Sequence, residues 1–328
     1  MRNYTFRLLA GFVVVTMLFA QGGCCVGGPV SIKQDHKDPA QWRMSNGTVE
    51  LMVDGAKGRV MAYGFKGGRN ILWTNAEPEN PKYRLGAWTN YGGDKIWTWP
   101  QSDWGWPPIE PASYDVQMGD DGKSLQMTSA PLAGYGLRIV RLIELAPSGT
   151  QVTFTTCFKP SGNSFAKPVA AWSITQVPHP KRILVRIPLK GDRQAYLNRV
   201  PDASDKFVAK AMSDSVVSLQ WTGEGGIKTF MEADVFASVF DDAIFLQHQL
   251  VAPGSDPWTP NQRAQIYCHP ATAGNIPPGP SYTELEWTAP LAPPNRLDLN
   301  PLRLTWQLVE TKTPLSDAQL VDIVKTAE

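Results

Sequence analysis

The sequence has few of the residues that build metal or disulfide sites, with four cysteines and four histidines in 328 residues. No CxxC, HExxH or Cys/His cluster occurs, which excludes the common structural zinc sites. Cys24 and Cys25 lie near the N-terminus, so only Cys157 and Cys268 remain for the folded part. These two either form one bridge in an oxidising compartment or are separate small buried residues.

Charge is also scarce, because charged residues make up 19% of the chain and 31 Lys and Arg balance 30 Asp and Glu. This balance lacks the basic face that nucleic-acid binding requires. The chain has no GxGxxG or Walker-type loop for nucleotide phosphates and no GxSxG elbow for acyl transfer. We therefore expect no nucleic-acid partner and no cofactor.

The longest uncharged apolar run near the N-terminus, residues 8–20, has 13 residues. A bilayer span needs about 20 residues, so this run with Arg2 and Arg7 before it predicts a signal peptide over residues 1–25. The following QGGCCVGG resembles a bacterial lipoprotein cleavage site. We expect an exported protein of the periplasm or cell envelope, with either a lipid on Cys24 or Cys25 or ordinary cleavage near Gly22. Membrane contact would then be limited to this terminus.

Alternation of apolar and polar residues dominates from about residue 47 onward. Four segments show this alternation most clearly, with apolar side chains on one face of each: GTVELMV, QVTFTTCF, RILVRIPL and LRLTWQL. A helix is predicted only near the C-terminus, where Ser316 and Gln319 form a capping box ahead of Leu320, Ile323 and Val324. The pattern predicts an all-β fold, a large antiparallel sandwich with a short C-terminal helix. A single domain would cover residues 41–328, after a polar tether over residues 26–40.

Half of the twelve tryptophans lie within 34 residues, between Trp73 and Trp106. The segment is broken by glycines and prolines, so it is either a packed lid, in which tryptophan fills volume, or a sugar site, in which indole rings stack on pyranose faces. Stacking on single-stranded nucleic acid is disfavoured because Lys95 is the one cation from Tyr91 to Pro108. The candidate binding residues of the segment are Tyr91, Asp94, Lys95, Trp97, Trp99, Gln101, Asp103 and Trp104.

The segment NYGGDKIWTWPQSDWGWPP resembles the hallmark of an uncharacterised bacterial family related to the galactose mutarotase-like (aldose epimerase) superfamily. GRVMAYGFKGGRNILW, the central strands and SYTELEW are similar in the same order, so the resemblance covers most of residues 47–310. It implies a β-supersandwich whose concave face binds carbohydrate. It also implies a glutamate on a late strand that takes the anomeric proton, with histidines as acid and binding groups.

In the late strand Tyr282, Glu284 and Glu286 share one face, and Leu285 and Trp287 share the other. The apolar pair predicts the core side, which leaves the two glutamates and Tyr282, a candidate binding residue, facing a cleft or solvent. Two carboxylates in a poorly hydrated pocket raise each other's proton affinity, which suits a general base. The resemblance favours Glu284 or Glu286 as this base without choosing between them, and a solvated strand face is the alternative.

The expected acid is missing, because the central strand AAWSITQV has no histidine. His179 lies between two prolines and is expected in a loop, whereas His248 is in phase with Ile244 and Leu246 and either lines the pocket or is a core residue. Tyr91, Asp94 or Lys95 would have to replace the acid.

These residues are consistent with two functions. The first is an exported carbohydrate-binding enzyme, an isomerase of the aldose 1-epimerase type. The second is a non-catalytic envelope protein whose tryptophans hold a glycan or only fill the core. A glycosidase would need a carboxyl pair at a defined separation, such as Asp94 or Asp103 against Glu284.

Overall fold

The computed structural model describes residues 29–80, 84–85, 88–104, 108–132, 134–162, 167–187, 206–223, 225–251, 258, 262–270, 281–293 and 300–327. The predicted signal peptide with Cys24 and Cys25, and also Trp106, lie outside the described residues. No helix in these ranges is long and apolar enough to cross a bilayer.

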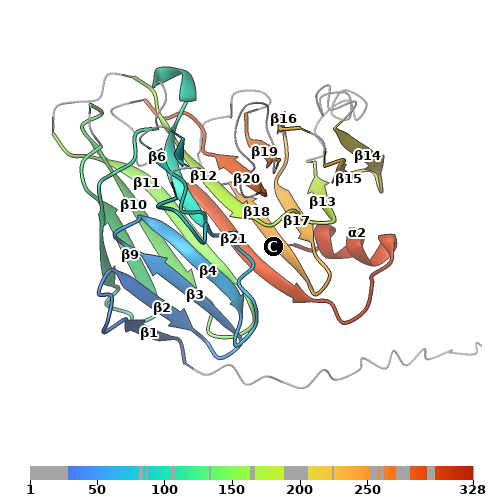
Figure 1. The fold of residues 1–328 in the computed structure, drawn as a ribbon, viewed down its shortest axis with the longest axis horizontal. Coiled ribbons are helices and arrows are strands. Elements are labelled where there is room, and N and C mark those ends of the chain that lie inside the picture. Colours follow the sequence, from blue (N-terminus) through green and yellow to red (C-terminus); the bar gives the residue numbers. More distant parts are fainter. Residues whose placement is uncertain are drawn as a thin grey trace, which may run out of the picture.

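Two antiparallel sheets face each other (Figure 1). Within the described ranges the first sheet has nine strands, in the order β1 (Ser31–Gln34), β2 (Gln41–Ser45), β3 (Val49–Asp54), β4 (Arg59–Phe65), β7 (Asp94–Trp99), β12 (Ala170–Val177), β20 (Tyr282–Thr288), β19 (Ala264–His269) and β16 (Ile227–Met231). The second sheet has ten, in the order β14 (Phe207–Ala211), β15 (Val216–Trp221), β13 (Arg182–Arg186), β17 (Val235–Val239), β18 (Ala243–Leu250), β21 (Leu302–Glu310), β11 (Val152–Pro160), β10 (Leu137–Leu145), β9 (Ser124–Ser129) and β8 (Tyr114–Met118). A two-stranded ribbon, β5 (Arg84–Leu85) with β6 (Trp88–Thr89), and a short 3₁₀ turn, η2 (Gln101–Asp103), belong to the tryptophan-rich segment. The predicted all-β antiparallel sandwich is confirmed.

The core lies between the sheets, where the inward side chains of both interdigitate. Trp287 of β20 packs on Phe236 of β17 with ring centroids 4.3 Å apart, and Trp306 of β21 lies 5.8 Å from Tyr63 of β4. Side chains alternate along the strands, so one face of each sheet packs in this core and the other face is turned away from it, although β12 in the middle of the first sheet is buried on both faces.

The C-terminal helix α2 (Asp317–Lys325) covers part of the outer face of the second sheet (Figure 1). Its capping box is present as predicted. The Ser316 side chain accepts from the backbone N–H of Gln319, and the Gln319 side chain accepts from the backbone N–H of Ser316. The buried stripe is Leu320, Val321 and Val324, whereas Ile323, predicted on this side, is only half-buried.

Part of the expected tether belongs to the first sheet, because β1 pairs with β2 along its whole length, from Ser31 opposite Ser45 to Gln34 opposite Trp42. Cys157 of β11 and Cys268 of β19 lie in different sheets and are not joined by a disulfide. The alternative of two separate cysteines is therefore the one observed.

Candidate functional site

The late-strand glutamates lie on the outer face of the first sheet, as the alternation predicts. Leu285 and Trp287 are fully buried on the inner face, and the Trp287 indole donates to Gln247 of β18 in the opposite sheet. Glu284 therefore points away from the core, between Gln176 of β12 on one side and Tyr267 of β19 on the other. This part of the outer face, built by β7, β12, β20, β19 and β16, is the candidate site.

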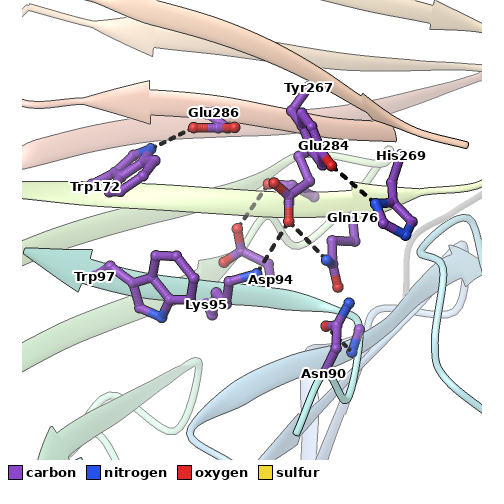
Figure 2. Close-up of polar contacts among 12 residues, drawn as sticks. Asn90, Asp94, Lys95, Trp97, Trp172, Gln176, Tyr267, His269, Glu284 and Glu286 are labelled. Atoms are coloured by element: carbon purple, nitrogen blue, oxygen red, sulfur yellow. Dashed lines mark hydrogen bonds and ion pairs between the residues drawn. The ribbon is translucent and has the colours of Figure 1, made fainter. Parts of the chain in front are cut away.

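Glu284 is held by two donors from neighbouring strands (Figure 2). Its Oε1 accepts from Gln176 Nε2 at 2.8 Å and from Lys95 Nζ at 3.3 Å. No described side chain bonds its Oε2, and 13% of the side chain is exposed. One carboxylate oxygen is thus fixed, and the other is available to a ligand.

Lys95 is almost completely buried beside this carboxylate. Its ammonium lies 4.7 Å from the Trp97 ring centroid and 5.3 Å from that of Trp88, which are cation–π distances. Burial lowers the pKa of Lys95, and the neighbouring Glu284 opposes that shift. Lys95 and Trp97 share the outer face of β7, so the structure brings these two predicted residues to Glu284.

A tyrosine–histidine pair lies across from Glu284 on β19 (Figure 2). The Tyr267 hydroxyl is 2.9 Å from His269 Nδ1. Burial, with help from the two glutamates, raises the pKa of Tyr267 to about 12, so this hydroxyl keeps its proton. Burial lowers the pKa of His269, with Glu284 opposing, so the ring is neutral near pH 7. The tautomer in which Tyr267 donates to Nδ1 has the ring proton of His269 on Nε2, where it can be donated to a ligand.

His269 and Tyr267 were missed from the sequence. The segment AQIYCH alternates, with Ala264, Ile266 and Cys268 on the inner face, and this signal alone would have placed Tyr267 and His269 on the outer face.

Tyr282, a predicted binding residue, packs in an aromatic stack at the end of β20. Its ring lies 4.9 Å from His269 and 4.6 Å from Trp73, nearly parallel to both. This stack orients the His269 ring.

Glu286 is fully buried, unlike Glu284. Its Oε2 accepts from Trp172 Nε1 and from Lys228 Nζ, each at 2.9 Å. Burial raises its pKa, Lys228 opposes the shift, and Glu284 adds to it. The structure therefore distinguishes the two glutamates that the sequence left equal, because 13% of the Glu284 side chain is exposed and none of the Glu286 side chain is.

The tryptophan-rich segment is largely packed. The Trp97 ring meets Trp88, Trp104 and Trp172 edge to face at 5.5–5.7 Å. Trp97 donates to Glu110 Oε1 at 2.6 Å and Trp104 to the Thr98 carbonyl at 3.0 Å, so these indole N–H groups are already occupied. Both rings are more than nine-tenths buried. They form a wall behind Lys95 rather than an open stacking surface.

Trp99 and Trp73 are the half-buried indoles of this region. Trp99 packs on Trp172 at 5.2 Å and donates to Gln262 Oε1 at 3.1 Å. These two rings keep the accessible aromatic surface that a sugar needs.

Asp94, predicted to bind substrate, instead lies in the core. It sits at the start of β7, one residue from Lys95, so alternation turns it to the inner face. Its Oδ2 accepts from Ser173 Oγ at 2.8 Å and Thr175 Oγ1 at 2.7 Å, and its Oδ1 is 2.5 Å from an Arg141 guanidinium nitrogen. An Asp94–Glu284 glycosidase pair is therefore ruled out.

Three other predicted residues have no described contact with Glu284. Gln101 and Asp103 are exposed on η2, and Asp103 lies 3.4 Å from Lys167. Tyr91 is half-buried beside Lys57 and Arg59, about 5.8 and 5.7 Å from its ring.

His248 is also displaced from the site, because β18 belongs to the second sheet. Its phase with Ile244 and Leu246 turns it to the outer face of that sheet, toward α2, where Arg186 is 3.3 Å away. The prediction that His248 binds substrate is wrong, since the core separates it from Glu284.

His179 follows β12 in a loop, as predicted, and links the ends of β19 and β20. Its Nδ1 lies 2.7 Å from Thr283 Oγ1, and its Nε2 lies 3.2 Å from the His269 carbonyl and also contacts Ser281 Oγ. Burial lowers the pKa of His179 to about 4.

This histidine predicts a pH dependence of stability. Its pKa is about 4 in the folded state and 6.5 in the reference state, so below pH 6.5 the unfolded chain binds a proton that the folded chain does not. The contribution of His179 to the free energy of unfolding is fully present above pH 6.5 and is lost as the pH falls toward 4. We expect His179→Gln to flatten the decline of Tm between pH 7 and pH 4 in thermal denaturation. An unchanged slope would contradict the assignment.

Among the described residues, no group of three or more His, Cys, Asp or Glu side chains is placed to hold a metal ion.

Comparisons with known proteins concern the fold. No family model matches the chain, and no curated protein matches its sequence. A TPR-domain containing protein from Parabacteroides distasonis is similar over 88% of this chain, with a TM-score of 0.50 and 14% identity. The chain spans about half of that protein, 48% of its length.

A candidate aldose 1-epimerase from Klebsiella pneumoniae is similar over 90% of this chain and 86% of its own, with 10% identity and a TM-score of 0.48. A candidate mutarotase from Salmonella typhimurium is similar over 86% and 97%, with 10% identity and a TM-score of 0.46. At 14% identity the likeness to the Parabacteroides distasonis protein concerns the fold alone, and the predicted family of the NYGGDK segment stays a prediction.

Proposed function

We propose that the outer face of the first sheet binds a free sugar and that Glu284 exchanges the proton of its anomeric hydroxyl, the reaction of an aldose 1-epimerase. The observation that carries this proposal is the carboxylate of Glu284, fixed through Oε1 and open at Oε2, directly across from Tyr267 with His269 beside it. Partly exposed aromatic rings around a few polar groups are typical of sugar sites.

In this reaction Glu284 Oε2 accepts the proton of the C1 hydroxyl. The C1–O5 bond breaks as O5 takes up a proton from solvent water, which gives the open-chain aldehyde. Rotation about C1–C2 and closure on the other face of C1, with Glu284 returning its proton to the C1 oxygen and O5 losing its proton to water, gives the other anomer. In this proposal His269 Nε2–H donates a hydrogen bond to the ring oxygen, and Lys95 stabilises the carboxylate form of Glu284.

A second function is favoured by the pKa of His269. Its neutral ring at pH 7 is a weaker acid than a histidinium, which suits holding a sugar without turnover. The two functions share one site and differ only in proton transfer.

A sugar panel tests both. We expect at least one free aldose to raise Tm in a thermal-shift series and to interconvert its anomers faster by polarimetry in the presence of the protein. Its methyl glycoside has a blocked anomeric oxygen and is the control, because it can bind but cannot mutarotate. Binding of the aldose with no acceleration would leave the non-catalytic function. No shift in Tm with any sugar would refute both.

We also propose that the chain is exported and anchored by a lipid on Cys24. The support is the sequence of residues 1–25 alone. Expression in a bacterial host should give a detergent-phase protein whose N-terminal peptide carries a diacylglycerol by mass spectrometry. Cys24→Ala should move it to the aqueous phase and Cys25→Ala should not. The opposite pattern would place the lipid on Cys25, and no lipid in either would indicate ordinary cleavage.

A further inference from the structure

Gln265 is a fully buried polar side chain on β19 whose amide nitrogen and oxygen both lack a hydrogen-bond partner. Directly across on β20, Glu286 is also fully buried, and its Oε1 has no partner. Native proteins pair most buried polar groups, because an unpaired one loses its hydration without compensation. Three unpaired atoms on one cross-strand pair therefore need a cause.

The other buried glutamines keep at least one end paired. Gln247 donates to Thr175 Oγ1 at 2.8 Å and accepts from Trp287 at 3.0 Å. Gln249 donates to the Thr288 carbonyl at 2.7 Å and accepts from Arg263 at 2.8 Å. Gln176 of β12 donates to Glu284 and has only its Oε1 unpaired. Gln265, with both ends unpaired, lies on the outer face of β19, the face that carries Tyr267 and the candidate site.

The position of this pair fits the second end of a sugar ring. Glu286 follows Glu284 by two residues on the same face of β20, a separation of about 6.6 Å along the strand. That is roughly the span between hydroxyls on opposite carbons of a pyranose. A ligand whose anomeric oxygen lies at Glu284 can therefore reach Glu286 with a hydroxyl from the far side of the same ring.

The charges around the pair select a neutral group. An anion would meet the carboxylate of Glu286, and a cation would meet the ammonium of Lys228, which is 2.9 Å from Oε2. Side chains directly opposite in an antiparallel pair have Cβ atoms about 5 Å apart, so one small group can touch both. A hydroxyl can accept from Gln265 Nε2 and donate to Glu286 Oε1.

We propose that Gln265 and Glu286 form a hydroxyl-specificity subsite, which binds the sugar hydroxyl remote from the anomeric carbon. This inference rests on the proposed function and narrows its substrate to a neutral pyranose with that hydroxyl free. Gln265 and Glu286 are fully buried, and Lys228, with 28% of its side chain exposed, is the described ionic partner of Glu286 that reaches solvent.

The test compares D-glucose, D-galactose and their 2-, 3-, 4- and 6-deoxy analogues as ligands of the wild-type protein and of Gln265→Leu by calorimetry. In the wild type, removal of one particular hydroxyl should weaken binding about tenfold or more. In Gln265→Leu the parent sugar and that analogue should bind equally, while the ratios for the other analogues stay as in the wild type. An unchanged ratio in Gln265→Leu overturns the subsite alone. A wild type that binds none of these sugars overturns both the subsite and the proposed function.

Stability supplies a readout that needs no ligand. If Gln265 is kept for binding, Gln265→Leu removes unpaired polar atoms, and Tm should equal or exceed that of the wild type. The matched control Gln247→Leu removes a paired glutamine and should lower Tm by about 2 °C or more. A comparable loss in Gln265→Leu would show that the residue is structural, with an internal water as its partner, and would overturn the subsite.

Discussion

Glu284→Gln should slow the catalysed interconversion of sugar anomers by about 10²–10⁴-fold, the range of a positioned general base. The substitution keeps an oxygen that can accept from Gln176 and Lys95, so the side chain stays in place while its basicity is lost. The measurement is polarimetry on a freshly dissolved single anomer, corrected for the spontaneous rate.

The matched control is Asp103→Asn, which also converts a carboxylate to an amide. Asp103 is on η2 beside Lys167, and none of its described contacts involves Glu284, so this variant should keep the wild-type rate. Circular dichroism spectra that match the wild type would show that both variants fold. Full activity in Glu284→Gln would show that Glu284 is not the general base of the reaction.

Arg141→Met should destabilise the fold by about 3–5 kcal/mol, the usual result of removing one partner of a buried ion pair. Arg141 of β10 and Asp94 of β7 are both buried between the sheets, with 2.5 Å between their charged atoms. The variant leaves the Asp94 carboxylate with only Ser173 and Thr175 as donors. Urea denaturation measures the loss.

The double variant Asp94→Leu with Arg141→Met should recover most of that loss, because no buried charge remains. Sugar binding by the folded double variant should stay close to wild type, since Asp94 faces away from Glu284. An Arg141→Met protein as stable as the wild type would contradict a buried pair. Loss of sugar binding in a folded double variant would show that Asp94 contributes to the sugar site.

Local alternation was enough to predict the sandwich and the outward direction of the late-strand glutamates. Each strand of this fold has one apolar face, and Leu285 with Trp287 mark it on β20. The same rule, applied to DKIWTW, would have turned Asp94 inward and Lys95 outward. The prediction for Asp94 was wrong because its place in a motif was weighed above its phase in the strand.

The neighbours of Glu284 could not be predicted in the same way. Gln176 precedes it by 108 residues and Lys95 by 189, and they meet only because β7, β12 and β20 are adjacent in the sheet. Strand order depends on contacts far apart in the chain, which periodicity does not encode. Likewise, the phase of His248 with Ile244 and Leu246 was correct, but periodicity does not show that β18 belongs to the second sheet.

The decisive measurement is a crystal structure of the protein with a bound aldose. We expect the anomeric oxygen within about 3 Å of Glu284 Oε2, the reach of a general base. We also expect His269 Nε2 on the ring-oxygen side. A sugar found only in another hollow would show that Glu284 is not in the sugar site. One such hollow is the cavity of about 420 Å³ lined in part by Lys33, Arg43, Glu50 and Lys66.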